Sequence, residues 1–180
     1  LAFNLPVSIP LWQAAFGSIV AIVVVKQLFG GIGQNFANPA ITARIIMMTA
    51  FSGTMTTWTF PDATSSATPL ALLYKGELNS LPSLKNMLLG IHGGCLGETC
   101  TLALIIGGIY LIARKVITWH TPVAFIGTVF VMSLLFDKEP VYQLMSGGLM
   151  LGAFFMATDY ATTPSTKWGK VIFGVGCGLI

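Results

Sequence analysis

The sequence predicts an all-α, polytopic transmembrane helical bundle that forms a single domain over residues 1–180. Apolar residues make up 54% of the chain and charged residues only 8%, against about 25% charged in soluble domains. The mean hydropathy is +0.81. So few charged side chains do not cover the surface of a soluble protein, which excludes a cytosolic enzyme, a secreted disulfide scaffold and a disordered tail. A net charge of +3, scattered along the chain, gives no basis for nucleic-acid binding.

Five apolar segments are candidates for membrane spans, because a span needs about 20 apolar residues. They are residues 11–29, 37–53, 87–113, 120–136 and 141–158, with a sixth beginning near Val171. No signal peptide is visible at Leu1, and the sequence stops within an apolar run. We therefore expect a fragment of a longer membrane protein.

Lysine and arginine near the ends of these segments indicate an orientation. If the chain crosses the membrane at each span, five of these basic residues lie on one side of the membrane and three on the other. We assign the first side to the cytoplasm, which places the loop 54–86 outside. The five are Lys26, Arg114, Lys115, Lys167 and Lys170. Arg44 lies inside the second span, where a charge faces the bundle interior or a cavity, or alternatively extends to the interface.

Two glycine-rich turns precede apolar segments on opposite predicted sides of the membrane. Residues 30–40 hold Asn35 and Asn38, three positions apart, and Asn38 suits the cap of a helix whose first turn contains Pro39. Residues 90–99 hold Glu98 inside an apolar run. Glycine lets backbone N–H groups approach a ligand closely, so both turns are candidate binding sites. The alternative is a pair of helix–helix turns without a ligand, with Glu98 paired or neutral. The three cysteines have no metal-binding spacing, and we expect no metal site.

Two stretches rich in Asp, Thr and Pro match these turns. Residues 62–69 lie on the predicted outside, and residues 159–164 on the predicted inside. Each is an odd number of spans away from its glycine-rich turn, as an inverted-topology repeat requires. We therefore expect inverted repeats with broken helices, since irregular backbone in a membrane must be surrounded by protein or line a cavity.

Five motifs along the chain carry a family resemblance. They are Leu5-Pro6 with Ile9–Ala14, Gly33–Ala40, Asp62–Pro69, Gly94–Thr99 and Ser146–Asp159. Together they resemble the family of RnfD, which is part of the Rnf ferredoxin:NAD oxidoreductase complex, and NqrB, which is part of the sodium-pumping NADH:quinone reductase. The resemblance covers nearly the whole chain and implies further spans at both ends.

The resemblance implies FMN attached by a phosphoester to a threonine in the motif Asp-x-x-Ser/Thr-Gly-Ala-Thr. The matching threonine is Thr68, with Asp62, Ser65 and Ala67 in register, while Ser66 stands where the family usually has glycine. A flavin transferase makes this bond outside the cytoplasm, in agreement with the orientation from lysine and arginine. The flavin ring carries the electrons and the protein sets its position and potential.

The resemblance also indicates which turns surround flavins. We expect the FMN ring near Gly97, Glu98 and Thr99. A second, non-covalent flavin, riboflavin, is expected toward the cytoplasmic side, because amide side chains both donate to and accept from the edge of the ring. Its expected contacts are Asn35, Asn38, Asp159 and Thr163.

The predicted function is electron transfer in a prokaryotic inner membrane, within an Rnf-type complex that couples ferredoxin oxidation and NAD reduction to Na⁺ or H⁺ translocation. No dinucleotide fingerprint or iron–sulfur cysteine set is present, so we expect neither an NAD nor a ferredoxin site here. Expected partners are the other Rnf subunits (A, B, C, E and G), the flavin transferase and membrane lipid. The alternatives are an NqrB-type protein that feeds quinone, a small-solute channel or transporter, which has no use for the motif ending at Thr68, and a purely structural scaffold.

Overall fold

The structure, a computed structural model, describes residues 1–31, 33–58, 68–76 and 81–180. These residues form helices and connecting segments, with no strand among them. The prediction of an all-α chain is therefore confirmed for the part of the chain that the structure describes. Within that part, none of the helices combines the length and the apolar character that crossing a membrane demands.

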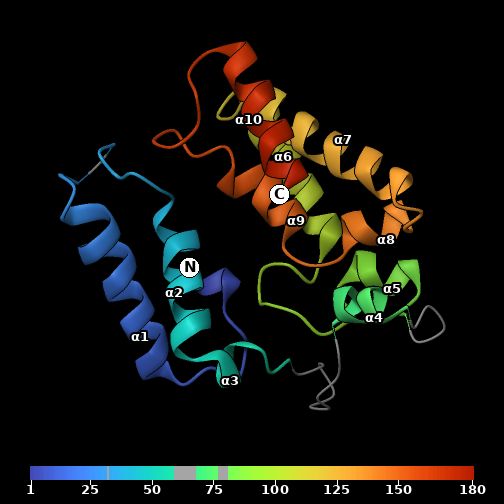
Figure 1. Cartoon of the computed structure of the whole chain (residues 1–180), viewed down its shortest axis with the longest axis horizontal. Helices are drawn as coiled ribbons and strands as arrows, with labels where there is room; N and C mark the ends of the chain where they lie inside the picture. Colours follow the sequence, from blue (N-terminus) through green and yellow to red (C-terminus); the bar gives the residue numbers. More distant parts are fainter. Residues whose placement is uncertain (32, 59–67, 77–80) are drawn as a thin grey trace.

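The first group of helices comes from the N-terminal part of the chain (Figure 1). It contains the short η1 (Ala2–Asn4), α1 (Leu11–Ile19), α2 (Pro39–Ala50) and α3 (Ser52–Met55). The π-helical segment η2 (Val20–Gln27) continues α1 without a break, so residues 11–27 of the predicted span 11–29 form one helical rod. α2 packs against this rod. Its contacts bury Met47 against Leu5 and Met55, and Ala43 against Val20 and Ala21.

The second group contains the C-terminal helices (Figure 1). They are α6 (Thr101–Ala113), α7 (His120–Leu135), α8 (Pro140–Met145), α9 (Leu149–Leu151) with its π-helical continuation η4 (Gly152–Met156), and α10 (Lys167–Leu179). The largest contact is between α7 and α10. It depends on glycine, because a Cβ on Gly174 would lie 2.7 Å from the carbonyl oxygen of Thr121.

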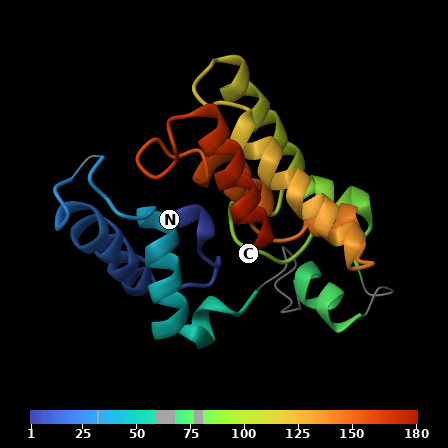
Figure 2. The same cartoon turned by 45° about the horizontal axis from the view of Figure 1, so that its top comes forward.

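Two short helices, α4 (Pro69–Lys75) and α5 (Leu84–Leu89), come between the two groups in the sequence. α5 contacts α6 and α8 of the second group, while α4 stands further out (Figure 2). Each ends at a glycine with a left-handed backbone, Gly76 at φ 77° and Gly90 at φ 88°. A left-handed backbone at the end of a helix favours glycine, because glycine has no Cβ to collide with the backbone.

Side-chain caps define where several helices begin. In each of them a hydroxyl or amide oxygen of the residue before the helix accepts a hydrogen bond from a backbone N–H of the first turn. The capping residues are Asn38 for α2, Thr68 for α4, Ser83 for α5 and Thr166 for α10. Pro39 and Pro69 occupy the first helical position, where a missing N–H costs nothing. The expected cap at Asn38 is therefore confirmed.

Two expected spans are interrupted in the structure. Residues 87–113 contain the end of α5, an irregular segment from Gly90 to Cys100, and α6. Residues 141–158 are divided at 146–148, between α8 and α9. Apolar composition alone did not reveal these breaks, although the glycines at both places signal them.

Candidate cofactor sites

The irregular segment from Ile91 to Cys100, here called the 91–100 loop, is held by the N-terminal residues. The N–H of Gly97 donates to the carbonyl of Phe3 at 2.8 Å, and the N–H of Leu96 donates to that of Leu5 at 3.4 Å. The buried His92 ring lies within hydrogen-bond distance of two carbonyl oxygens of the loop, with Nε2 at 2.9 Å from that of Thr99. The loop is therefore fixed in place despite having no regular structure.

Glu98 is buried in this loop, with 5% of its surface exposed. Its Oε1 accepts a hydrogen bond from the N–H of Cys95 at 3.0 Å. Its Oε2 is also buried and has no hydrogen-bond partner among the described residues. A buried polar atom without a partner costs about 1–3 kcal/mol, and more when it is charged. The carboxylate therefore has one oxygen available for a ligand.

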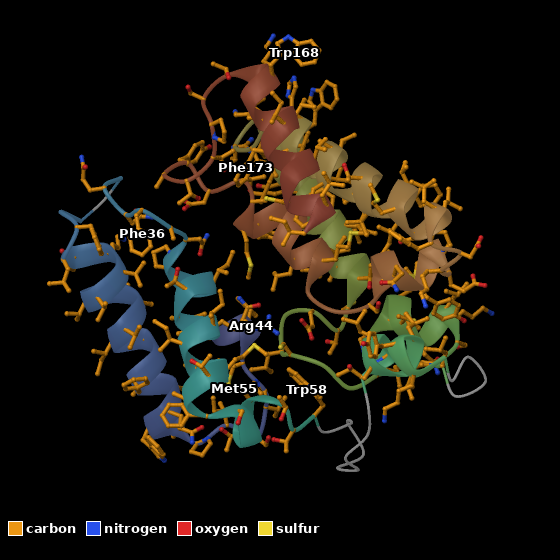
Figure 3. The ribbon with its side chains drawn as sticks, viewed as in Figure 1. Phe36, Arg44, Met55, Trp58, Trp168 and Phe173 are labelled. Atoms are coloured by element: carbon orange, nitrogen blue, oxygen red, sulfur yellow. The ribbon has the colours of Figure 1, made fainter. Side chains whose placement is uncertain are left out.

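Arg44 extends from α2 toward the same loop (Figure 3). Its Nη1 donates to Oδ1 of Asn4 at 3.1 Å, and its Nη2 lies 3.4 Å from Sγ of Cys95. Sγ of Cys95 in turn donates to the carbonyl of Asn4 at 3.3 Å. Of the two interpretations of Arg44, these contacts favour the one in which the guanidinium faces the interior.

A cavity of about 150 Å³ lies where Arg44, Thr68 and Glu98 meet. Thr68 is half-buried at the start of α4, and its Oγ1 accepts from the N–H of Ala71 at 3.3 Å. The other lining residues are Trp58, Pro69, Leu70, His92, Gly93, Gly147 and Gly148. The structure thus brings the motif threonine and the buried carboxylate together, although they are far apart in the sequence.

The remaining residues expected around FMN are placed differently. Asp62, Ser65, Ser66 and Ala67 lie outside the described residues. Gly97 and Thr99 line a separate, largely apolar cavity of about 390 Å³. The other residues that line that cavity are Phe3, Leu96, Cys100, Ala103, Leu104, Leu151 and Phe155.

A second polar cavity, of about 560 Å³, contains most of the residues expected around riboflavin. Asn35, Asn38 and Asp159 all line it, together with Lys26, Gly33, Pro39, Ala40, Tyr160 and Ala161. Oδ1 of Asn38 caps α2, so the Nδ2 of Asn38 is the atom that it offers to a ligand. Asn35 donates through Nδ2 to the carbonyl of Ala37 at 2.9 Å, so its Oδ1 is the atom it offers.

Thr163 lies apart from this group. It lines a neighbouring cavity of about 260 Å³ with Thr158 and Lys170, and its Oγ1 donates to the carbonyl of Ala157 at 2.8 Å. Tyr160 borders both cavities.

Sequence reasoning missed several lining residues. Gly148 falls within the predicted span 141–158 and the motif Ser146–Asp159 but is not among the predicted site residues, although consecutive glycines at 147–148 inside an apolar segment signal a break. Lys26 was used only for orientation, and nothing in the sequence marked Trp58. Within the described ranges, no cluster of His, Cys, Asp or Glu side chains is suited to hold a metal ion.

Comparison with known proteins gives a match along the whole chain. The sequence model described as the NQR2, RnfD, RnfE family matches residues 1–180. The D subunit of the Na⁺-translocating ferredoxin:NAD⁺ oxidoreductase complex of Acetobacterium woodii is 48% identical over 185 residues, which cover all of this chain and 58% of that protein.

Two further relatives differ in the function that their names state. The D subunit of the proton-translocating ferredoxin:NAD⁺ oxidoreductase complex of Clostridium ljungdahlii is 40% identical and is covered to 60% of its length. The B subunit of the Na⁺-translocating NADH-quinone reductase of Azotobacter vinelandii is 35% identical and is covered to 49%. The chain thus spans about three fifths of the length of the ferredoxin-linked relatives that it matches.

Proposed function

Because the chain belongs to the NQR2, RnfD, RnfE family, we propose that it is the flavin-bearing part of the D subunit of an Rnf-type ferredoxin:NAD oxidoreductase complex. Identity to the D subunits of ferredoxin-linked complexes, at 48% and 40%, exceeds the 35% identity to the NADH-quinone reductase protein. This difference favours ferredoxin and NAD over quinone as the reactants of the whole complex. The relatives' names include both Na⁺ and proton translocation, so either ion suits the proposal.

The observation that carries the proposal is the meeting of Thr68 with Glu98 and Arg44 at one cavity. FMN attached to Thr68 would supply electron transfer there, while the protein holds the ring and sets its potential. The residues fit such a group, because a hydroxyl for the phosphoester, an unpartnered carboxylate oxygen and a guanidinium border the same space. The A, B, C, E and G subunits of the complex would then be its partners, and a flavin transferase would attach the FMN to Thr68.

A second flavin, riboflavin, is proposed for the 560 Å³ cavity. Two amide side chains, Asn35 and Asn38, and the carboxylate of Asp159 border it. Together they offer both donors and acceptors to a heterocyclic ring. Thr163 lies at the neighbouring cavity, so we propose it as a support for the 159–164 stretch rather than as a contact.

We further propose that the chain lies in the prokaryotic inner membrane, with Thr68 on the outer side. Large apolar side chains are exposed on the outward faces of the longest helices, as lipid contact requires. On α6 and α7 they include Leu102, Ile106, Ile109, Val123, Val131 and Leu134. Further spans from the rest of the full-length protein would complete the bundle.

The two cavities also support the inverted repeat. One contains the glycine-rich turn 90–99 with Thr68 of the first Asp/Thr/Pro stretch, and the other contains the turn 30–40 with residues 159–161 of the second stretch. Each cavity therefore combines the turn of one half with the stretch of the other, which is the arrangement that a pseudo-two-fold axis produces.

Attachment of FMN is tested on the full-length protein, expressed together with a flavin transferase. After denaturing electrophoresis, the wild-type band should fluoresce under ultraviolet light, and mass spectrometry should find FMN on the peptide containing Thr68. Thr68→Val should give a dark band, whereas the matched change Thr64→Val, in the same motif, should leave the fluorescence unchanged. A dark wild-type band would contradict the proposal and favour the channel alternative.

A further inference from the structure

Among the described residues, no donor reaches the buried Oε2 of Glu98, which leaves the local network of hydrogen bonds incomplete there. Elsewhere in this network the described residues supply the partners: Oε1 is bonded to Cys95, and Arg44 is bonded to Asn4 and Cys95. A carboxylate that is buried with one free oxygen is strongly destabilising unless a donor reaches it. A ligand with a hydrogen-bond donor at this position would remove that penalty.

Gly148 shows that the free oxygen and the guanidinium border the same space. A Cβ built on Gly148 would lie 3.1 Å from Oε2 of Glu98 and 3.7 Å from Nη1 of Arg44. Both side-chain ends therefore lie within 4 Å of a single point, and glycine places no side chain there. Any residue can adopt the backbone of Gly148, at φ −79°. The role of glycine at this position is therefore to leave the space beside Glu98 and Arg44 open.

The carboxylate of Glu98 and the guanidinium of Arg44, lying beside one another, suit a ring edge that has an N–H donor next to a carbonyl oxygen. The pyrimidine part of a flavin ring has an N3–H donor flanked by carbonyl oxygens, one of which adjoins N1. A carboxylate accepts from such an N–H, and a guanidinium, with five N–H donors, can donate to the neighbouring oxygen while keeping its bonds to Asn4 and Cys95. Flavin is thus a suitable occupant for both groups at once.

We infer that Glu98 and Arg44 bind the pyrimidine edge of the FMN ring, with Glu98 accepting from N3–H and Arg44 donating at the N1/O2 side, and that their charges set its reduction potential in opposite directions. This inference rests on the proposed attachment of FMN to Thr68. It goes beyond that attachment by naming the two residues that position the ring and the edge of the ring that they contact.

The opposite effects follow from the charge that reduction creates. When the ring takes up two electrons and one proton, it gains one negative charge, centred at N1 and O2. The guanidinium of Arg44 stabilises that charge and the carboxylate of Glu98 destabilises it. Both charges are incompletely screened by water, because Glu98 is buried and Arg44 is half-buried.

The test is a reductive titration of the full-length, FMN-bearing protein with dithionite, which supplies the electrons while the buffer supplies the proton. The absorbance of the Thr68-linked flavin is followed against dyes of known potential. Arg44→Gln should lower the equilibrium constant for reduction at least tenfold, about 30 mV for a two-electron couple. Glu98→Gln should raise it by a similar factor, and Arg44→Lys should stay within threefold of the wild type.

Arg114→Gln is the matched control, because it removes the same charge from an exposed position after α6. It should change the equilibrium constant less than threefold. Glu98→Gln keeps the size of the side chain and a carbonyl acceptor, so it tests the inference even if Arg44→Gln does not accumulate. In resonance Raman spectra, the ring bands that shift when N3–H is deuterated should also move in Glu98→Gln.

The outcomes separate this inference from the proposed function. A wild-type protein without covalent flavin overturns both. A fluorescent protein in which Arg44→Gln and Glu98→Gln shift the potential in the same direction, or by less than threefold, overturns the inference alone. Unchanged N3 bands in Glu98→Gln would likewise show that the carboxylate does not contact the ring.

Discussion

The contact between α7 and α10 gives a stability prediction whose size follows from distances. Gly174→Ala would place a Cβ 2.7 Å from the carbonyl oxygen of Thr121 and 2.9 Å from Cβ of Ala124. Carbon atoms in contact prefer about 3.5–4.0 Å, so the new atom is roughly 0.6 Å or more too close. Because the oxygen belongs to the backbone, it cannot rotate away, and α10 must move off α7. Overpacking of this kind costs about 1–3 kcal/mol.

Gly176→Ala is the matched control on the same helix, since among the described residues no heavy atom apart from those of its chain neighbours and its own helix backbone lies within 4 Å of its Cβ position. Both changes gain the same preference of alanine over glycine in a helix, about 1 kcal/mol, so their difference isolates the collision. The chain covers 58% of its Acetobacterium woodii relative, so for the longer full-length protein we expect about 1–2 °C per kcal/mol. With a difference of about 2 kcal/mol, Gly174→Ala should melt roughly 2–4 °C below Gly176→Ala. Far-ultraviolet circular dichroism of the full-length protein in detergent measures both. Equal melting temperatures, or a higher one for Gly174→Ala, would refute the close packing of the two helices.

The remaining predictions concern the two cavities and the orientation. Asn35→Ala and Asn38→Ala should both reduce the riboflavin that acid extraction recovers, but only Asn38→Ala should also lose the α2 cap, worth about 1 kcal/mol; wild-type riboflavin content in both would remove these residues from the site. Gly97→Ala places a Cβ 2.5 Å from that of Phe3, so it should displace the 91–100 loop and reduce covalent FMN in the gel assay, and full fluorescence would show that the loop does not depend on this contact. In a cysteine-free background, a membrane-impermeant thiol reagent applied from outside intact cells should label Thr68→Cys and leave Lys170→Cys unlabelled, and the reverse pattern would invert the proposed orientation.

The helical character and several local features follow directly from the sequence. The pair Asn38-Pro39 predicted the start of α2, because an amide cap followed by proline suits the first turn of a helix, and the structure has this cap. Asn35, Asn38, Asp159 and Thr163 were expected around one flavin. The first three line one cavity, whereas Thr163 lines a neighbouring one. The family resemblance indicated this grouping, since the polarity of the residues marks them as candidates but does not say which of them meet.

Other features depend on contacts between distant segments, which a single sequence does not encode locally. Spans 87–113 and 141–158 read as continuous because apolar composition does not show where the backbone leaves the helix. Neighbours in sequence also face different ways: Glu98 borders the cavity with Thr68, whereas Gly97 and Thr99 line another. The irregular backbone of the 91–100 loop, docked on Phe3 and Leu5, gives these residues their separate directions.

Helix α2 contributes to both polar cavities. Asn38, which caps the helix, lines the 560 Å³ cavity, and Arg44, six residues further along the chain, lines the 150 Å³ cavity. At 1.5 Å per residue these positions are about 9 Å apart along the helix axis. If both cavities hold flavins, helix α2 fixes the distance between the two electron carriers. One residue inserted after Ala40 would lengthen that gap by only about 1.5 Å but turn Arg44 by about 100° around the axis, so the register of α2 would control electron passage more strongly than its length.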